Sequence, residues 1–571
     1  MALRLAWASI VISVTWGAAS VTKSDPESCV ELKAQATRPA PKILAAPMQA
    51  PFSRTMFELL LEQAGRRPMH PAVIAGNVTL SYADLAMRAS SVAARLMADG
   101  VKRGDRVGLL GNNSPEWLEI FFGAAALGAV VAPFSTWSTT AELEFLLQDA
   151  RVSTLFTMRG FGDHNFDESI QALRAGGTVP DLKRVVVYDG QRGMGDVDFA
   201  EYQTGSLATL PPPGESASAA DTLVMLYTSG SSSRPKCVPL THGGAIENAF
   251  NIGERQGIQP DDKVLISIPL FWSYGAVNAL PAVLSHGATL VLQKRFQPAE
   301  ALDIIERQGC TGFYTLPAMT SALLAEPGFS LDRTKTLRTG VTIGAPQDVR
   351  RTAEELGISD ICNIYGSTEG YGNSCVTPHD WPLEQRIQCQ GPPLPGVTVR
   401  IRDPETGGLL GAGEVGEIEF SGYLTPGYAG DSAQHNANVF TADGFFRTGD
   451  LGALNADGSL GYAGRLSEII KSSGINVSPV EVEEAMQQHP DVALVGVTGV
   501  EDAVKGELIV AYVVARPGAA PTPDTLRQHC RTLLSAYKTP ARIILTDSLP
   551  LTATGKLMRR DLRVMAAAAQ Y

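Results

Sequence analysis

A stretch near the middle of the chain combines hydroxyls, glycine and a lysine in a pattern that suits phosphate binding. It reads LYTSGSSSRPKCVPLTH and runs from Leu226 to His242. Its candidate ligands are Thr228, Ser229, Gly230, Ser231, Ser232 and Lys236. Backbone N–H groups, hydroxyls and an ammonium group can all stabilise phosphate oxygens. The same composition also fits a flexible linker or a Ser-rich surface turn, so this stretch alone leaves both interpretations open.

The flanking residues predict the elements that would hold this loop. The apolar run TLVMLYT before it predicts a strand, and LTHGGAIENAFN after it predicts the start of a helix. A strand, a turn of small residues and a helix form a setting in which backbone N–H groups converge on an anion. The order GxxxxGK[ST] of a nucleotide P-loop is missing, so the motif does not support ordinary ATPase chemistry.

The rest of the chain alternates between predicted helices and strands. Helical spacing covers 55–65 and 82–100, while 105–111 and 130–134 are short apolar runs typical of strands. This alternation predicts an α/β fold: a large N-terminal domain with mixed, mainly parallel sheets covered by helices. Short strands and turns after Gly391 predict a small β subdomain, and a compact α+β tail begins near Arg465.

We therefore expect three parts: an N-terminal extension over 1–51, a large domain over 52–464 and a smaller C-terminal domain over 465–571. The extension has an apolar run from about Leu5 to Val14, followed by small residues, which resembles a signal peptide. This run is too short to be a stable membrane span. The alternative is a mis-assigned start or a disposable extension ahead of a cytoplasmic enzyme.

Composition narrows the class of protein. The chain has 571 residues, of which 44% are hydrophobic and 19% charged, and its net charge is −12. This charge gives no basic surface for nucleic acid, so small-molecule chemistry is favoured. Seven cysteines are scattered without a CxxC pair, which favours reduced thiols over a disulfide framework or a zinc site.

Five further motifs follow the Ser-rich stretch. They are TIGAP (342–346), NIYGSTEG (363–370), GFFRTGDLG (444–452), GYAGRLSEIIKSSGINVSPVEVE (461–483) and LPLTATGKLMRRDL (549–562). In this order and spacing, the set closely resembles the adenylate-forming superfamily of acyl-CoA synthetases, luciferases and peptide-synthetase adenylation domains. The resemblance covers roughly 52–563 and identifies the Ser-rich stretch as the family's phosphate loop, normally YTSG[ST]TGxPKG.

The resemblance implies a reaction with two halves. A carboxylate attacks the α-phosphorus of ATP, pyrophosphate leaves and an acyl-AMP forms; a thiol, usually that of coenzyme A, then attacks the acyl carbon. Two anions meet in the first half, so cations and oriented donors are needed where charge accumulates. The phosphate loop would hold the β- and γ-phosphates.

The other nucleotide contacts are implied by the same resemblance. Thr368 would bond the α-phosphate, and Glu369 would ligate Mg²⁺, since a metal explains a carboxylate beside triphosphate. Asp450 would accept hydrogen bonds from the ribose hydroxyls, with Arg465 close by. The adenine would lie among Tyr365, Gly366, Ser367, Gly344, Ala345 and Pro346. Considered singly, Glu369 also fits a solvated surface carboxylate and Asp450 a turn residue.

Lys556 is the main catalytic candidate. By resemblance, its ammonium group would touch both the attacking carboxylate and the α-phosphate and stabilise the adenylation transition state. An exposed surface lysine is the plainer interpretation of the residue itself. Lys471 and Gly474 would face the acceptor in the second half-reaction, after the mobile C-terminal domain has changed its pose.

Three positions depart from the family pattern. Ser233 stands where glycine is usual, Cys237 where glycine follows the lysine, and Ser467 at a hinge position that is often Asp or Lys. Ser233 and Cys237 remove no phosphate donor, so we expect altered ATP affinity and retained activity. No covalent enzyme intermediate is needed, which makes Cys237 a poor candidate for a nucleophile.

The segment PLFWSYGAVNAL (269–280) matches the part of the family that lines the acyl pocket. Its candidate wall residues are Phe271, Trp272, Tyr274 and Gly275, with Gly370 from the NIYGSTEG motif. Trp272 replaces a common histidine, and the Asp that peptide-synthetase domains use for an α-amino group is missing. An uncharged pocket suits a fatty, alicyclic or aromatic acid. Trp272 could equally be a core residue.

The sequence thus predicts an AMP-forming carboxylate–CoA ligase for a hydrophobic acid, using ATP, Mg²⁺ and coenzyme A. One alternative is an acyl-AMP ligase that loads a separate carrier protein. Another is a nucleotide-binding homologue with impaired catalysis, which the departures at Ser233, Cys237 and Ser467 would explain.

Overall fold

The structure, a computed structural model, describes residues 54–189, 197–203, 216–228, 235–472, 475–502, 506–534, 536–552 and 557–568. The predicted extension over 1–51 lies outside these residues, and so do six predicted site residues: Ser229, Gly230, Ser231, Ser232, Gly474 and Lys556.

A seven-stranded sheet carries the first predicted motif. Its strand order is β11-β10-β4-β3-β5-β8-β9, and every neighbouring pair is parallel except β10 with β11. Strands β4 and β5 are buried along their whole length, as expected for parallel strands covered on both faces. The strands are β3 (Arg106–Leu110), β4 (Val130–Phe134), β5 (Thr154–Met158), β8 (Arg184–Asp189), β9 (Val197–Asp198), β10 (Thr222–Thr228) and β11 (Lys236–Thr241).

The prediction that the Ser-rich loop leads directly into a helix is wrong, because a strand lies between them. Residues Lys236–Thr241 form β11, which pairs with β10 from Thr228↔Lys236 to Thr222↔Thr241. The β-branched and apolar residues of KCVPLT fit a strand that is buried over four positions. Helix α7 (His242–Gln256) begins only afterwards, where the Thr241 side chain accepts from Gly244 N–H.

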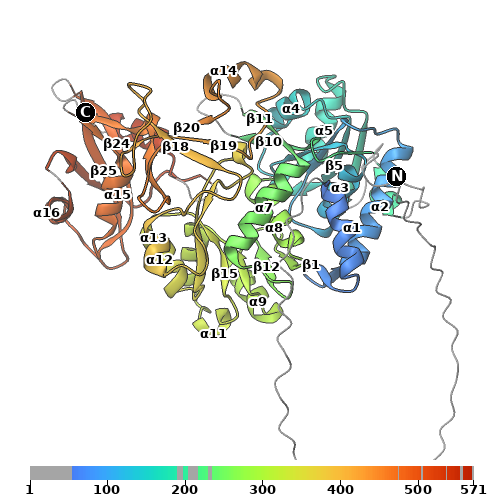
Figure 1. The fold of residues 1–571 in the computed structure, drawn as a ribbon, viewed down its shortest axis with the longest axis horizontal. Coiled ribbons are helices and arrows are strands. Elements are labelled where there is room, and N and C mark those ends of the chain that lie inside the picture. Colours follow the sequence, from blue (N-terminus) through green and yellow to red (C-terminus); the bar gives the residue numbers. More distant parts are fainter. Residues whose placement is uncertain are drawn as a thin grey trace, which may run out of the picture. The chain divides into compact units, whose positions relative to one another are not determined.

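A second sheet of eight strands has the order β17-β16-β15-β14-β12-β13-β1-β2. The pairs from β16 through β1 are parallel, and the two edge strands are antiparallel. The strands are β1 (Pro71–Ala75), β2 (Val78–Ser81), β12 (Lys263–Ile266), β13 (Thr289–Leu292), β14 (Gly312–Tyr314), β15 (Thr339–Thr342), β16 (Asp360–Tyr365) and β17 (Cys375–Val376). Figure 1 shows β12 and β15 beside helices α7 and α8 (Leu280–Ser285).

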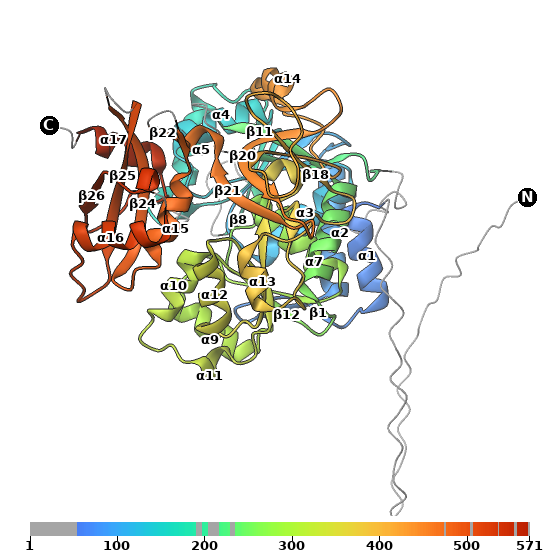
Figure 2. The same ribbon diagram turned by 60° about the vertical axis from the view of Figure 1, so that its left-hand side comes forward.

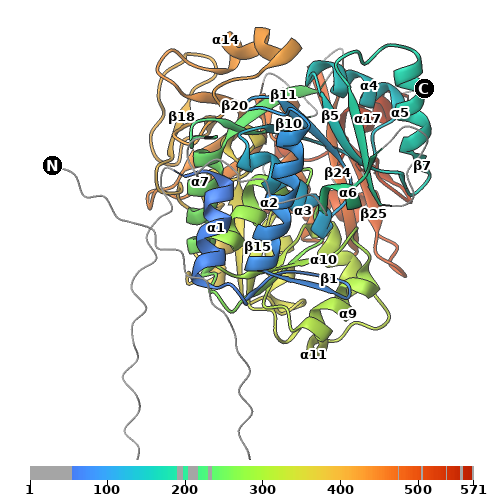
Figure 3. The same cartoon turned by 90° about the vertical axis from the view of Figure 1, so that its right-hand side faces the viewer.

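Helices at the N-terminal side confirm the predicted pattern. Helix α1 (Met56–Arg66) begins with a capping box on Thr55, and α2 (Tyr82–Ala98) with one on Ser81. Ser114 caps α3 (Pro115–Ala126), whose first residue is a proline. These three helices pack against one another (Figure 3) and bury one continuous apolar core.

The remaining helices connect strands or cover the sheets. They are α4 (Thr140–Asp149), α5 (Phe166–Ala175), α6 (Ala200–Gln203), η1 (Tyr274–Ala279), α8 (Leu280–Ser285), α9 (Pro298–Gln308), α10 (Pro317–Leu324), α11 (Leu331–Thr334), α12 (Pro346–Glu354), η2 (Thr368–Gly370), α13 (Leu383–Gln388), η3 (Gly430–His435) and α14 (Asn436–Val439). A short hairpin, β6 (Gly160–Phe161) with β7 (His164–Asn165), precedes α5.

The predicted small β subdomain is present. It is an antiparallel sheet of four strands: β18 (Thr398–Arg402), β19 (Gly416–Ser421), β20 (Phe446–Leu454) and β21 (Leu460–Arg465). Its centre holds Glu419, whose buried carboxylate is paired with Arg400 and Arg402. A buried charge needs such partners, and these ion pairs join β18 to β19.

The chain beyond Arg465 builds an α+β layer (Figure 2). This layer has its own apolar cores. Its strands form one five-stranded sheet. Helices of the same part of the chain accompany this sheet. The elements are η4 (Leu466–Glu468), β22 (Ile470–Ser472), β23 (Ile475–Val477), α15 (Pro479–Gln487), β24 (Val492–Asp502), β25 (Gly506–Ala515), α16 (Pro523–Leu533), η5 (Ala536–Lys538), β26 (Arg542–Leu545) and α17 (Arg559–Ala568).

The structure also bears on membrane topology. None of the helices within the described residues has both the length and the apolar composition that a membrane span requires.

Candidate active site

Three predicted site segments follow parallel strands of the eight-stranded sheet. The segment with Trp272 comes after β12, TIGAP spans the end of β15, and YGSTE begins at the last residue of β16. Parallel strands end at one edge of a sheet, and α/β proteins bind their ligands outside the carboxyl ends of such strands. The topology therefore brings these segments to one edge.

A direct contact joins the predicted acyl segment to the predicted phosphate-binding turn. The Ser273 Oγ lies 3.1 Å from the Thr368 Oγ1, so the two hydroxyls form a hydrogen bond. Ser273 immediately follows Trp272, and Thr368 immediately precedes Glu369. The side chains that would hold the acid and the α-phosphate thus belong to adjoining segments.

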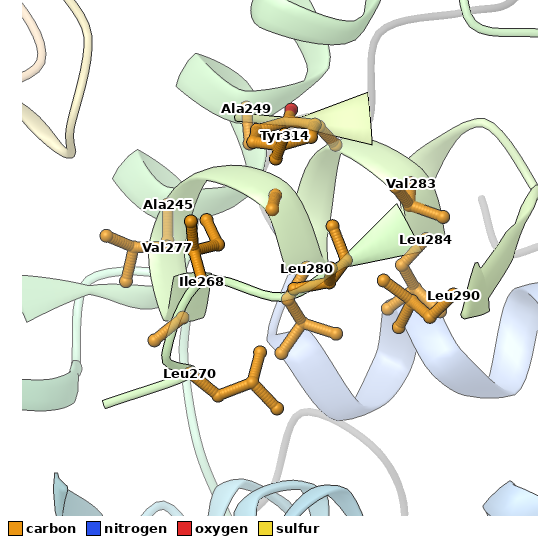
Figure 4. Close-up of a cluster of buried hydrophobic side chains, with 14 of the residues drawn as sticks. Ala245, Ala249, Ile268, Leu270, Val277, Leu280, Val283, Leu284, Leu290 and Tyr314 are labelled. Carbon is orange, nitrogen blue, oxygen red and sulfur yellow. The ribbon is translucent and has the colours of Figure 1, made fainter. Parts of the chain in front are cut away.

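The acyl segment enters a π-helix, η1 (Tyr274–Ala279), which is an uncommon element found mainly at functional sites. Gly275 has no room for a side chain, since a Cβ there would lie 2.4 Å from the Pro269 carbonyl oxygen. The Tyr274 hydroxyl donates to the Val341 carbonyl at 3.0 Å, which ties the π-helix to β15. Figure 4 shows the apolar base of this segment, where Leu270 and Val277 face the core.

Asn113 fixes the backbone that leads into the acyl segment, a role that no sequence motif indicates. Its Nδ2 donates to the Ile268 carbonyl at 2.8 Å, and its Oδ1 accepts from the Leu270 N–H at 2.8 Å. Asn113 is buried and follows β3, so it links the two large sheets just before Phe271. A buried amide with both ends bonded holds one backbone conformation.

The predicted wall residues Phe271 and Trp272 contact a third ring, Trp137, which no sequence motif indicates. Trp137 lies 5.5 Å from Phe271 and 5.4 Å from Trp272 between ring centroids, and Phe271 lies 6.1 Å from Trp272. All three pairs are edge-to-face, the arrangement that aromatic quadrupoles favour. Trp137 follows β4, so its place beside β12 depends on sheet order. Trp137 could not be predicted to lie beside Trp272, because a single tryptophan between two predicted elements belongs to no motif.

Tyr428 connects the predicted phosphate lysine to the predicted metal ligand. The Lys236 Nζ lies 5.0 Å from the centre of the Tyr428 ring, and the Tyr428 hydroxyl donates to the Glu369 Oε1 at 2.7 Å. Burial, with the Glu369 charge, raises the pKa of Tyr428, so the hydroxyl stays a donor. Tyr428 could not be predicted as a site residue because it lies outside all five motifs.

The backbone of Cys237 holds the residues that follow Tyr428 in position. Its N–H donates to the Ser432 Oγ at 3.0 Å, and its carbonyl accepts from the Ala429 N–H at 3.0 Å. The side chain is buried, and burial raises the pKa of the thiol to about 12. This environment keeps the thiol protonated, which agrees with the expectation that Cys237 is not a nucleophile.

A second polar cluster surrounds Asp450 on β20. The Tyr365 hydroxyl donates to the Asp450 Oδ2 at 2.9 Å, and the Arg465 Nε lies 3.0 Å from its Oδ1. Asp450 and Arg465 are paired residues of β20 and β21. The Tyr462 ring lies 6.0 Å from that of Tyr365. The structure thus brings together three residues that sequence motifs far apart had singled out, and adds Tyr462.

The turn after β16 is tightly built. A Cβ on Gly366 would lie 2.2 Å from the Gly372 carbonyl oxygen, so only glycine fits. Tyr371 has a left-handed backbone with φ 57°, and its hydroxyl accepts from the Thr241 N–H at 3.1 Å. A strained non-glycine residue is retained where the surroundings fix it, often at functional sites. This contact anchors the Thr368 and Glu369 turn, with Ser367 and Gly370, to the end of β11.

The TIGAP residues form the start of α12. Ala345 is the N-cap, Pro346 is the first helical residue, and the Asp348 Oδ2 accepts from the Ala345 N–H at 3.2 Å. Gly344 packs against Asp348, since a Cβ there would lie 2.8 Å from the Asp348 Cβ. Burial raises the pKa of Asp348 above its ordinary value. The helix start is thereby fixed next to the end of β15.

Of the predicted site residues in the C-terminal part, Lys471 lies within the described residues, whereas Gly474 and Lys556 lie outside them. Lys471 lies on β22 with an exposed side chain, and its N–H donates to the Glu507 Oε2 at 2.6 Å. Arg559, three residues after Lys556, pairs with Glu468 at 2.6 Å and with Glu483 at 2.5 Å. Arg559 thus connects the residue after Ser467 to the start of α17.

This chain is similar to known families and to known proteins over most of its length. The AMP-binding enzyme family matches residues 60–429, and the AMP-binding enzyme C-terminal domain matches residues 481–556. The putative acyl-CoA synthetase YngI of Bacillus subtilis is 31% identical over 535 residues, which cover 89% of this chain and 96% of YngI.

A second relative is the fatty acid–[acyl-carrier-protein] ligase ScoC of Streptomyces coeruleorubidus, 33% identical over 90% of this chain and 96% of ScoC. The crystal structure of ATP-bound MatB from Rhodopseudomonas palustris matches with a TM-score of 0.80 and 27% identity, over 90% of this chain and 100% of MatB. The chain therefore belongs to the AMP-binding enzyme family, in its acyl-CoA synthetase branch, and is an AMP-forming acid–thiol ligase.

Proposed function

We propose that this enzyme activates a hydrophobic carboxylic acid, whether fatty, alicyclic or aromatic, to acyl-AMP and transfers the acyl group to coenzyme A. The observation that carries the proposal is the continuous path of contacts from Lys236 through Tyr428 and Glu369 to Thr368, Ser273 and the aromatic rings. A phosphate lysine and an apolar wall at the two ends of one path suit a reaction between ATP and an apolar acid.

The nucleotide would lie along the edge of the eight-stranded sheet. We assign the adenine to the Tyr365 ring and the start of α12, and the ribose hydroxyls to Asp450. Asp450 is 6% exposed and already binds Tyr365 and Arg465, which hold its carboxylate in one orientation. Thr368 would donate to the α-phosphate, and Lys236 with the Ser-rich loop would neutralise the β- and γ-phosphates.

Mg²⁺ fits this arrangement as a shared ligand of the protein and the triphosphate. Within the described residues, Tyr428 is the one side chain that bonds to the Glu369 carboxylate, and no larger cluster of metal-ligating side chains occurs there. Mg²⁺ commonly uses one or two carboxylates plus substrate phosphates. Glu369 would hold the ion, whose charge would offset that of the phosphates. Tyr428 orients the carboxylate.

The acyl pocket is assigned to the apolar rings. The segment 269–280 and the loop 132–141 carry no charged residue, so nothing on them could compensate a buried ammonium group. Gly275 and Gly370 allow close packing behind this wall, since a Cβ on either would collide with neighbouring protein atoms. A carboxylic acid without an ammonium group is therefore a better fit than an α-amino acid.

The two half-reactions would use different faces of the C-terminal domain, which we place at 465–571 after the large domain at 52–464. Lys556 would stabilise the adenylation transition state, and Lys471 and Gly474 would face the thiol in the second half. Ser467, beside the Glu468–Arg559 ion pair, would be the point about which this domain turns.

A carrier protein is the second candidate for the acceptor. The name of the relative ScoC includes transfer to an acyl carrier protein, and ScoC is similar to this chain over nearly its full length. The deciding experiment measures acyl transfer from the same acid, ATP and Mg²⁺ to coenzyme A and to a phosphopantetheinylated carrier. We expect faster acyl-CoA formation. Faster loading of the carrier would favour the alternative acceptor.

The alternative, a nucleotide-binding homologue with impaired catalysis, predicts a different result. Such a protein would bind ATP but would show no acid-dependent pyrophosphate release. Cys237 argues against impairment, since it is accommodated in β11 with both backbone groups bonded and without displacing Lys236 from its contact with Tyr428. Absence of pyrophosphate release across a broad panel of acids would overturn the proposed function.

A further inference from the structure

The aromatic cluster of Phe271, Trp272 and Trp137 is graded in exposure. Phe271 is 6% exposed, Trp272 is half-buried and Trp137 is 40% exposed. The three rings lie within 5.4–6.1 Å of one another, so they form one continuous apolar surface from the core outward. A large exposed tryptophan beside buried rings is an apolar surface available to a ligand.

Trp137 is held in place by its own loop. The Ser135 Oγ accepts from the Trp137 N–H at 3.1 Å, and the Ser135 carbonyl accepts from the Ser138 N–H at 3.1 Å. The next residue, Thr139, caps α4 through a capping box with Glu142. The turn and the cap fix both sides of Trp137, so its position is determined by local sequence as well as by ring contacts.

The loop also lies at the edge of the sheet that carries the phosphate lysine. Strand β4 is the parallel neighbour of β10, and the two strands end at Phe134 and Thr228. The Phe134 ring lies 6.4 Å from that of Tyr227, whose hydroxyl donates to Asp149 at the end of α4. Trp137 is therefore placed by the same strand pair that leads into the Ser-rich loop.

Resting on the proposed function, we propose that Trp137 is a specificity-determining residue that forms the outer wall of the acyl pocket and binds the distal part of long or ring-bearing acids. The inner wall is Trp272, adjacent to the Ser273–Thr368 contact where the carboxylate would react. A short acid would contact only the inner rings. A longer one would reach Trp137 and gain the burial of an otherwise exposed indole.

This placement gives Trp137 and Trp272 opposite effects on specificity. Removing the inner ring opens space near the reacting end and favours bulky acids. Removing the outer ring takes away apolar contact from acids long enough to reach it. A residue that only supported the fold would change all acids alike.

The test is the affinity of non-hydrolysable acyl-sulfamoyladenosines with chains of four, eight and twelve carbons, measured by calorimetry. Trp137→Ala should weaken binding of the longest analogue about ten-fold and leave the shortest within about two-fold, since only the longest buries the indole. Trp137→Phe should restore most of the loss.

Trp381→Ala is the matched control, because Trp381 is also partly exposed but lines a separate cavity of about 510 Å³ beside α7. It should leave all three affinities unchanged. A Trp137→Ala profile that falls equally for every length, or not at all, would overturn the assignment. Failure of the proposed function would look different. In that case the wild-type enzyme would bind none of the analogues and would release no pyrophosphate with any acid.

Discussion

At the scale of single residues, Trp272 is the proposed determinant of which acid this enzyme accepts. Trp272 stands where a histidine is common in the family, and its ring contacts Phe271 and Trp137. Ser273, the next residue, bonds to Thr368, so the backbone at Trp272 is fixed relative to the turn that carries Thr368. In the proposed acyl pocket, the Trp272 ring would therefore limit the width close to the carboxylate.

Trp272→Ala should shift preference toward bulkier acids, because it removes a ring near the narrow end of the pocket. The ratio of kcat/KM for a cyclic or branched acid to that for a straight-chain acid should rise about ten-fold, as expected when one pocket contact changes. Acid-dependent pyrophosphate release with both acids measures this ratio. An unchanged ratio would show that Trp272 is a core residue and that the pocket lies elsewhere.

Helices α12 and α15 bring together carboxylates whose charge depends on pH. Burial, followed by the charges of Glu483, Glu481 and Asp348, raises the pKa of Glu484 from 4.5 to about 7. Glu484 and Asp348 belong to the two different helices. An acid with a raised pKa binds its proton more tightly in the folded chain, so this group stabilises the fold below pH 4.5 and loses that contribution as pH rises toward 7.

Glu484→Gln should remove this dependence. In the wild type, the group should lower the free energy of unfolding by on the order of 2 kcal/mol between about pH 4.5 and pH 8. Thermal unfolding at both pH values checks this: the variant should gain stability relative to the wild type mainly at the higher pH. Glu354→Gln, an exposed residue of α12 that pairs with Arg350, is the control. Equal behaviour of both variants would contradict the assignment.

The sequence predicted most elements that hold the site but not the contacts between them. Strand β4 and helix α2 follow from apolar spacing and end signals, whereas β11 was missed because a six-residue strand after a Ser-rich turn has no periodicity of its own. Asn113, Trp137 and Tyr428 could not be predicted. Each acts through residues distant along the chain, and their partners depend on sheet order.

At the scale of the whole molecule, one site must serve two reactions. The apolar cores of the chain before and after Arg465 are separate, and Arg559 ties the segment after Lys556 to Glu468 beside the proposed hinge. Separate cores allow a domain to change pose without unfolding. This organisation supports a division of labour in which Lys556 serves adenylation and the Lys471 face serves thiol transfer.

Lys556→Ala should therefore affect the two halves unequally. Acid-dependent pyrophosphate release should fall by about 100-fold or more, since the ammonium group would stabilise charge only in the first transition state. Transfer of a supplied acyl-AMP to coenzyme A should change far less. Equal losses in both assays would refute this division of roles.

The most direct test of the central claim is exchange of labelled pyrophosphate into ATP across acids of graded length and ring content. We predict that medium-chain and cyclic acids support faster exchange than acetate and than every α-amino acid. Each added methylene should contribute about 0.8 kcal/mol until the pocket is full. If acetate or an amino acid proves the best substrate, the assignment of an apolar acyl pocket to Phe271, Trp272 and Trp137 is contradicted.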